Sequence, residues 1–194
     1  MNKFILASAS PRRKELLGRM GLDFEVIVSE GDENSVPTDI PVNLYVQELA
    51  MLKASATAKQ AEKDGIIIAA DTVVTLDGKV LGKPADVGSA FDMLKTLSAR
   101  EHEVYTGVCV MRKRDAKTVC KAVCTSVRFK ELTDEKIRAY ISTGEPMDKA
   151  GAYGIQGLGA MLIEGISGDY FNVVGLPVAT LADILENEFE IKTL

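Results

Sequence analysis

The stretch ILASASPRRKELL (residues 5–17) contains the first group of side chains suited to chemistry. Ser8, Ser10, Arg12 and Arg13 lie there, where an apolar strand is predicted to run into a helix. The N-terminus of a helix carries a partial positive charge, so two guanidinium groups beside it are unfavourable unless an anion binds. Backbone N–H groups and guanidinium forks directed at one ligand form an anion site. The junction therefore predicts an anion-binding site, with a solvated helix end as the alternative.

A second candidate is a carboxylate inside an apolar run. Asp71 interrupts the sequence IIIAADTVV (residues 66–74). An acidic side chain in a buried strand must be paired, metal-bound or functional, although a structural Asp at a bulge or strand end is the alternative. Lys53 is predicted on the inner face of a helix, and Lys83 lies in the sequence LGKP. Each is either a ligand-binding cation or an ordinary surface lysine.

The segment 146–177 is unusually rich in glycine, with seven glycines among its residues. It also contains Asp148, Lys149 and Gln156. Glycines allow tight turns and a close approach of the backbone to a ligand. The sequence contains no GxxxxGK[ST] pattern, so a P-loop is excluded, and these glycines do not form a dinucleotide-binding fingerprint after a strand. The alternative is an irregular surface loop.

Together these groups predict a cationic cleft with a few carboxylates, on a protein whose net charge is -5. That combination suits a metal-complexed polyphosphate, because Arg and Lys bind the phosphates. Carboxylates hold a hard cation such as Mg²⁺ and orient water. The acidic net charge argues against nucleic acid or a membrane surface as a partner. No apolar run approaches the length of a membrane span.

The 194 residues predict one domain (1–194) in a cytoplasmic protein, since no signal-peptide layout follows the start of the chain. The three cysteines are odd in number and lack metal-ligand spacing, which predicts buried, reduced thiols. The single histidine, His102, excludes a histidine metal cluster. We expect it to be an ordinary surface residue at the mouth of a strand.

Hydrophobic periodicity and turn residues predict an α/β or α+β protein with a mixed sheet, and we expect the α/β class. The predicted helices cover residues 11–20, 42–63, 86–100, 133–144 and 177–188. The predicted strands cover 3–7, 24–29, the run 65–78, 79–84, 101–114 and 116–132, with hairpin turns at 77–78 and 114–115. Ser10 and Pro11 are favourable as the first cap and first helical residue.

The motifs resemble, in order from about residue 5 to 178, those of the Maf family of nucleoside triphosphate pyrophosphatases. They read LASASPRRKELL, LAMLKA, AADTVV, GKP, TGV, DKAGAYGIQG and GDYFNVVGLP. The resemblance implies an inosine-triphosphatase-like (Maf/Ham) fold with two lobes around a deep cleft. It also implies hydrolysis of a nucleoside triphosphate to the monophosphate and pyrophosphate, a divalent metal (Mg²⁺ or Mn²⁺) and a homodimer.

Carried over residue by residue, the resemblance makes Asp71 the proton acceptor for the attacking water. Glu33 becomes the carboxylate that holds metal with Asp71 or orients water, and Glu30 and Asp32 lie close enough in sequence to be alternatives. The implied phosphate contacts are Ser8, Ser10, Arg13, Lys53 and Lys83, with Lys53 also catalytic. Arg12, Thr72 and Gln156 agree with the branch that acts on dTTP and UTP, whereas the branch acting on 7-methyl-GTP usually differs there.

Three other functions remain open at this point. One is a pyrophosphatase with a broader or modified pyrimidine preference. Another is a regulator of cell division that inhibits septum formation, for which nucleotide binding is secondary. The last is a nucleotide-binding module without turnover. An intact Asp71 and a full basic set favour an enzyme.

Overall fold

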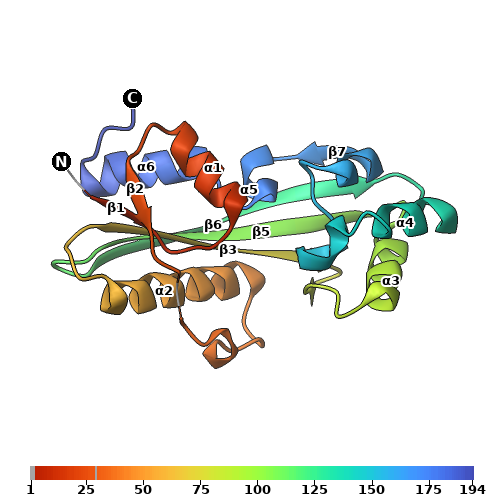
Figure 1. The fold of residues 1–194 in the computed structure, drawn as a ribbon, viewed down its shortest axis with the longest axis horizontal. Helices are drawn as coiled ribbons and strands as arrows, with labels where there is room; N and C mark the ends of the chain where they lie inside the picture. The colour runs from red at the N-terminus through yellow and green to blue at the C-terminus, as the bar shows by residue number, and fades with distance from the viewer. Residues whose placement is uncertain (1–2, 29) are drawn as a thin grey trace. The chain divides into compact units, whose positions relative to one another are not determined.

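A mixed sheet of seven strands organises the structure, a computed structural model that describes residues 3–28 and 30–194. The strand order is β2-β1-β3-β5-β6-β7, and β4 pairs with β3 (Figure 1). The strands are β1 (Phe4–Leu6), β2 (Phe24–Val26), β3 (Ile66–Leu76), β4 (Lys79–Leu81), β5 (Glu101–Arg112), β6 (Lys117–Phe129) and β7 (Ile163–Ser167). Strand β1 is parallel to β2 and β3, whereas β4 and β7 are antiparallel to β3 and β6. The α/β class with a mixed sheet is therefore confirmed.

Several helices begin at residues that the sequence marks as caps. The helices are α1 (Pro11–Arg19), α2 (Val42–Gln60), α3 (Val87–Leu97), α4 (Asp134–Ile141), α5 (Tyr170–Val174) and α6 (Val178–Phe189). The Ser10 side chain accepts a hydrogen bond from the Arg13 backbone N–H, and Pro11 is the first helical residue. Asp77 and Gly78 both have positive φ, as the turn between β3 and β4 requires. The predicted strand 24–29 ends at Val26, and its last residue lies outside the described part of the chain.

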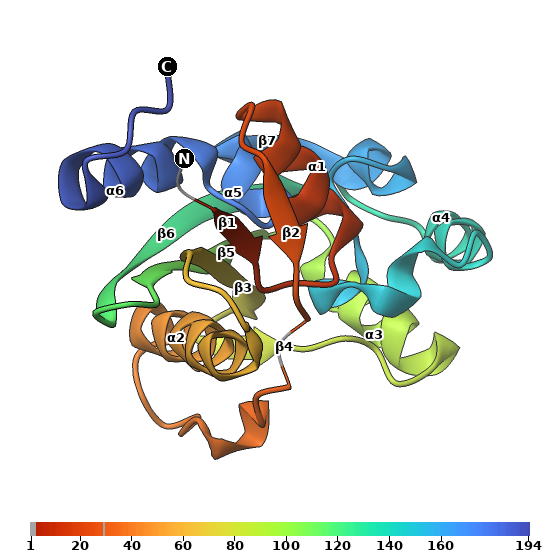
Figure 2. The ribbon, with the colours of Figure 1, turned by 60° about the vertical axis from the view of Figure 1, so that its left-hand side comes forward.

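The chain divides into two compact units, and β3, β5 and β6 each contribute residues to both. The first unit comprises residues 1–71, 106–123 and 175–194, and the second comprises 72–105 and 124–174. In the first unit, α2 covers one face of the sheet, and α1 and α6 cover the other (Figures 1 and 2). In the second, α3 and α4 pack on a core that includes Phe129, Tyr140 and Tyr153.

Helix α2 packs directly on strand β5 because residue 107 of that strand is glycine. A Cβ atom at Gly107 would overlap the backbone carbonyl of Val46 in α2. The Gly in the TGV motif therefore lets the helix backbone approach the sheet closely, which sets the distance between α2 and strands β3 and β5. Ala50 and Ala54 of the same helix are fully buried in the core below it.

The glycine-rich segment is more regular than the irregular loop considered as its alternative. It contains β7, α5 and three 3₁₀ turns, η2 (Glu145–Asp148), η3 (Ala150–Ala152) and η4 (Leu158–Leu162). Strand β7 pairs with β6, with Val127 opposite Ile166. This pairing joins distant parts of the chain, so local sequence patterns did not reveal it.

The predicted surface position of His102 is wrong. The residue is 2% exposed, because along β5 the side chains alternate and those of His102 and Val104 face the core. The Nε2 atom of His102 lies 2.7 Å from the Tyr153 hydroxyl in a hydrogen bond, and the imidazole packs edge-on against Phe129. Burial lowers the pKa of His102 to about 4.

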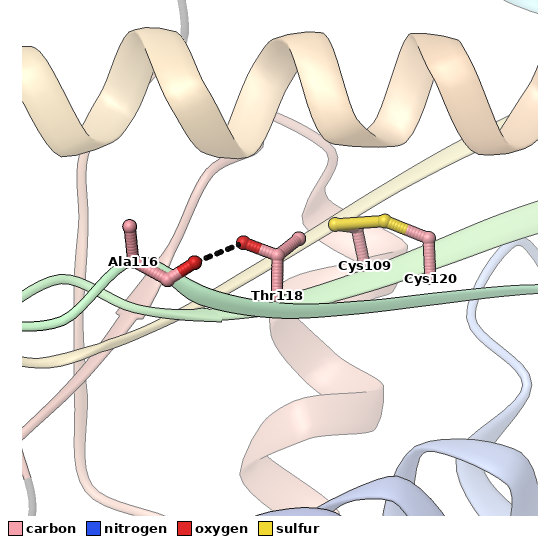
Figure 3. Close-up of a disulfide and its surroundings, with 4 residues drawn as sticks. All are labelled: Cys109, Ala116, Thr118 and Cys120. Carbon is pink, nitrogen blue, oxygen red and sulfur yellow. Dashed lines mark hydrogen bonds between the residues drawn. A yellow bond between two sulfur atoms is a disulfide. The ribbon is translucent and has the colours of Figure 1, made fainter.

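The predicted set of buried, reduced thiols is also wrong. Cys109 on β5 and Cys120 on β6 form a disulfide, with their Cα atoms 4.1 Å apart (Figure 3). Strands β5 and β6 are hydrogen-bonded neighbours in the sheet, so the side chains of Cys109 and Cys120 can contact each other across the two strands. Cys124, four residues further along β6, is exposed. In the described residues, no helix is long and apolar enough to cross a membrane.

Candidate functional site

The first unit brings together three charged side chains that lie far apart in the sequence. The ammonium group of Lys53, on α2, donates a hydrogen bond to Oδ1 of Asp71 on β3. The same ammonium lies 3.0 Å from Oε1 of Glu33, in the 3₁₀ turn η1 (Glu33–Ser35). The side chains of Lys53 and Asp71 are each 14% exposed, whereas that of Glu33 is 56% exposed. Lys53 is therefore a nearly buried cation between two carboxylates, and the surface-lysine alternative does not apply to it.

The strand-to-helix junction is organised around Ser8 and Arg13. The Ser8 hydroxyl oxygen accepts hydrogen bonds from the Ser10 backbone N–H (3.2 Å) and from Arg13 Nη1 (3.3 Å). Arg13 Nε also donates to the carbonyl oxygen of Gly175, at 2.8 Å. The guanidinium is thus fixed by groups from both ends of the chain, and Arg12 and Arg13 are both partly buried beside the start of α1.

Electrostatic effects connect this junction to the carboxylates. Burial lowers the pKa of Arg13, the negative charge of Asp71 opposes that shift, and the neighbouring Arg12 adds to it. Glu33 also opposes the shift, more weakly. Asp71 therefore acts on both Lys53 and Arg13, and the two predicted groups form one charged site in the first unit.

Tyr45 belongs to this site and was missed by the sequence reasoning. Burial raises the pKa of its hydroxyl, and the negative charges of Asp71 and Glu33 raise it further. Helical spacing gave only a weak signal for it, because at 3.6 residues per turn Tyr45 lies about 80° around α2 from Lys53. Gly175, whose carbonyl holds Arg13, is also a missed residue, because a backbone acceptor has no residue-type signature.

The remaining predicted residues belong to the second unit. Thr72 is half-buried on β3, directly after Asp71, whereas Lys83 and Gln156 are exposed. The loop with Lys83 is tied to the glycine-rich segment, because the Gly151 N–H donates to the Gly82 carbonyl at 3.0 Å.

The donor set of the first unit fits a hard divalent cation. Among the described residues, no group of three or more His, Cys, Asp or Glu side chains is placed to hold a metal by itself. Asp71 and Glu33 supply two carboxylates on either side of one ammonium. Mg²⁺ is commonly bound by one or two carboxylates together with substrate phosphates and water, so these two residues would hold it.

Comparison with known proteins gives consistent results. Residues 3–188 match the family described as Maf-like protein. The chain is 54% identical over 182 residues to the dTTP/UTP pyrophosphatase of Clostridium novyi (strain NT), covering 94% of this chain and 95% of that protein. It is 52% identical over 192 residues to the dTTP/UTP pyrophosphatase of Thermoanaerobacter sp. (strain X514), covering 99% and 100%.

Among solved structures, the chain is similar to the Ham1 protein of Staphylococcus aureus, with 18% identity and a TM-score of 0.48 over 66% of this chain and 72% of that one. The family match spans nearly the whole sequence and includes the junction, the Lys53 helix and the Asp71 strand. The chain belongs to the Maf family.

Proposed function

We propose that this chain hydrolyses dTTP and UTP to the nucleoside monophosphate and pyrophosphate. The observation that carries the proposal is the position of the Lys53 ammonium between the carboxylates of Asp71 and Glu33. The same site includes the junction with Ser8 and Arg13, to which we assign phosphate binding. Relatives that are about half identical to this chain over nearly their whole length are named dTTP/UTP pyrophosphatases.

In the proposed reaction, the α-phosphorus of the substrate is attacked by water. The water oxygen forms a bond to this phosphorus while the bond to the α–β bridging oxygen breaks, and pyrophosphate leaves. Asp71 accepts the proton that the water loses, a role that general bases fill with gains of about 10²–10⁴ in rate. Lys53 and Arg13 stabilise the negative charge that develops on the phosphate oxygens.

A divalent cation, Mg²⁺ or Mn²⁺, held by Asp71 and Glu33 together with substrate oxygens, would neutralise phosphate charge. Ser8 and Ser10 donate their hydroxyl hydrogens to phosphate oxygens in this proposal. Lys83 supplies a further cation to the phosphates. An ion-paired Asp71 of low exposure favours an enzyme over a septum-inhibiting regulator, because a pure binder needs no such group.

We assign selection of the substrate's nucleobase to Arg12, Thr72 and Gln156. The Gln156 amide offers both a donor and an acceptor to the edge of a pyrimidine. A site built to hydrogen-bond one nucleobase edge rejects other nucleobases, since its own polar groups would then be left unpaired.

We further propose that residues 1–194 act as one domain, in a cytoplasmic homodimer. Light scattering on the purified chain would measure the oligomeric state.

The test is an assay of pyrophosphate release from dTTP, UTP, CTP, GTP and 7-methyl-GTP, each with Mg²⁺ and with Mn²⁺. We expect dTTP and UTP to have the highest kcat/KM and the reaction to require a divalent cation. Hydrolysis in ¹⁸O-labelled water should place the label in the monophosphate. Dominant turnover of a purine nucleotide, or label in the pyrophosphate, would overturn the proposal.

A further inference from the structure

The second unit contains a carboxylate that the reaction does not use, enclosed by the loop that carries Gln156. Glu145 begins the turn η2, and its Oε1 accepts hydrogen bonds from the Gly159 N–H (3.1 Å) and the Tyr140 hydroxyl (2.9 Å). Its Oε2 accepts the Leu158 N–H at 2.8 Å. The Tyr140 hydroxyl oxygen in turn accepts the Gly154 N–H at 3.2 Å. Both ends of the segment 154–159 are thus bound to one carboxylate, directly or through one hydroxyl.

The glycines of this segment are required by that arrangement. A Cβ atom at Gly157 would lie 2.6 Å from the carboxyl carbon of Glu145. A Cβ atom at Gly159 would lie 2.7 Å from the Tyr140 hydroxyl oxygen, and one at Gly154 would lie 2.7 Å from Cε of Lys149. Gly157 and Gly159 let the loop backbone approach the carboxylate and the Tyr140 hydroxyl at hydrogen-bonding distance, and Gly154 leaves room for the Lys149 side chain.

The charge on Glu145 suits this role. Burial by itself would raise its pKa, but the hydrogen bonds from Gly159, Leu158 and Tyr140 and the nearby Lys149 outweigh that effect and lower the pKa. Lys149 is held beside it, because its Nζ donates to the Glu145 carbonyl oxygen (2.7 Å) and to the Asp148 carboxylate (2.6 Å). An ionised carboxylate accepts stronger hydrogen bonds from backbone N–H groups than a neutral acceptor does.

Gln156 lies between the bound ends of this segment and is exposed. Its side chain is therefore presented by a short loop whose backbone is fixed two residues before it and two and three residues after it. A loop of small residues without such bonds would sample many conformations and would lose entropy on binding a base.

We propose that Glu145 is a positioning residue that holds the loop 154–159 in the conformation in which Gln156 binds the base, and so sets base selectivity. This inference rests on the proposed function, in which Gln156 binds the pyrimidine. Glu145 touches neither the phosphates nor the attacking water in this scheme. Its removal should therefore change KM and the preference among bases, with little effect on kcat.

The test compares Glu145→Gln with Glu135→Gln, a matched change at an exposed position of helix α4. The amide nitrogen that replaces one carboxylate oxygen in Glu145→Gln cannot accept a hydrogen bond, so the bonds made by that oxygen are lost: the Leu158 N–H bond of Oε2, or the Gly159 N–H and Tyr140 hydroxyl bonds of Oε1. For Glu145→Gln we expect KM for dTTP to rise about tenfold, kcat to change less than about threefold, and the dTTP-to-CTP ratio of kcat/KM to fall about tenfold. Glu135→Gln should match the wild type. Unchanged KM and selectivity in Glu145→Gln would overturn the inference.

A milder variant and a double variant keep the test decisive. Tyr140→Phe removes only the hydroxyl that joins the Gly154 N–H to Glu145, and we expect a smaller change in the same direction. If Glu145 acts through Gln156, the Glu145→Gln/Gln156→Ala double variant should have the KM and selectivity of Gln156→Ala alone. Additive effects would contradict the inference.

Amide hydrogen exchange gives a readout that is independent of turnover. In Glu145→Gln, protection should fall at Leu158, or at Gly159 and Gly154, according to which carboxylate oxygen the amide nitrogen replaces, with the core strands unchanged. Unchanged protection at all three amides would overturn the inference. If the wild type fails to hydrolyse dTTP and UTP, the proposed function fails. If Gln156→Ala alters base selectivity and Glu145→Gln does not, only the positioning role of Glu145 fails.

Discussion

The ammonium group of Lys53 donates a hydrogen bond to the carboxylate of Asp71, across the gap between helix α2 and strand β3. The bond engages Oδ1 of the proposed general base, and the remaining lone pairs of the carboxylate are those that can accept the proton of the attacking water and contact a cation. Because Glu33 lies 3.0 Å from the same ammonium, Lys53 also separates two like charges.

Replacing Lys53 with Met should lower kcat/KM for dTTP by about 10²-fold, since a donor to the developing phosphate charge is lost. It should also destabilise the protein by about 1–3 kcal/mol, because an acceptor of low exposure loses its partner. Lys113→Met is the control, since the Lys113 ammonium donates to the Ala61 carbonyl oxygen rather than to a carboxylate of the site. If Asp71→Asn does not recover stability in the Lys53→Met background, the two side chains are not coupled as described.

The two arginines of the junction should have separable effects. Arg13 is fixed by Ser8 and by Gly175, so Arg13→Gln should lower kcat/KM for dTTP and CTP by similar factors. Arg12→Gln should change the ratio between the two nucleotides more than Arg13→Gln does. Steady-state kinetics on both substrates measure this, with Arg19→Gln on the same helix as control. If the dTTP-to-CTP ratio of kcat/KM is the same in both variants, Arg12 has no role in nucleobase selection.

The close packing of α2 on β5 predicts a large effect at Gly107. In Gly107→Ala, the new methyl group meets the Val46 carbonyl, so the helix must move away from the sheet. We expect a loss of about 1–3 kcal/mol in the free energy of unfolding, and lower turnover because Lys53 moves with the helix. Gly18→Ala is the control, because open space surrounds Gly18 within α1 and the change should stabilise by about 0.5–1 kcal/mol. A Gly107→Ala protein as stable as the wild type would contradict this packing.

His102 should make the protein less stable in mild acid. Its pKa is about 4 in the folded state against an ordinary value of 6.5, so between these values the unfolded chain binds more protons. Stability should therefore fall as the pH drops from about 6.5 to 4, by up to about 1.4 kcal/mol per pH unit. Urea unfolding of wild type and His102→Gln at pH 7, 6 and 5 measures this. Because His102 is the single histidine in the sequence, His102→Gln should lose this fall in the free energy of unfolding between pH 7 and pH 5. The same fall in both proteins would contradict the prediction for His102.

Local signals in the sequence were sufficient for much of the fold. Ser10 with Pro11, Thr133 and the Asp77–Gly78 turn each fix backbone angles within a few residues, and the structure has elements that begin or turn at each of them. Lys53 was placed on the inner face of α2 by helical spacing alone, and its burial agrees.

What the sequence did not reveal depends on contacts between distant strands. The Cys109–Cys120 disulfide requires the register of β5 and β6, and strand β7 forms only by pairing with β6. His102 was expected at the surface because it lies at the mouth of a strand, although its place in the alternation of β5 decides its burial. Glu145 was missed because its partners are backbone N–H groups of a loop that only the folded chain brings to it.

The measurement that tests the central claim most directly is the turnover of dTTP by Asp71→Asn at saturating substrate and Mg²⁺. The amide preserves the shape of the side chain but cannot accept the proton from water, so kcat should fall at least about a hundredfold. The melting temperature and circular dichroism spectrum should show an intact fold. Asp77→Asn is the matched control, because Asn suits the Asp77–Gly78 turn equally well, and it should match the wild type. A folded Asp71→Asn protein with kcat within a few-fold of the wild type would contradict the assignment of Asp71 as the base.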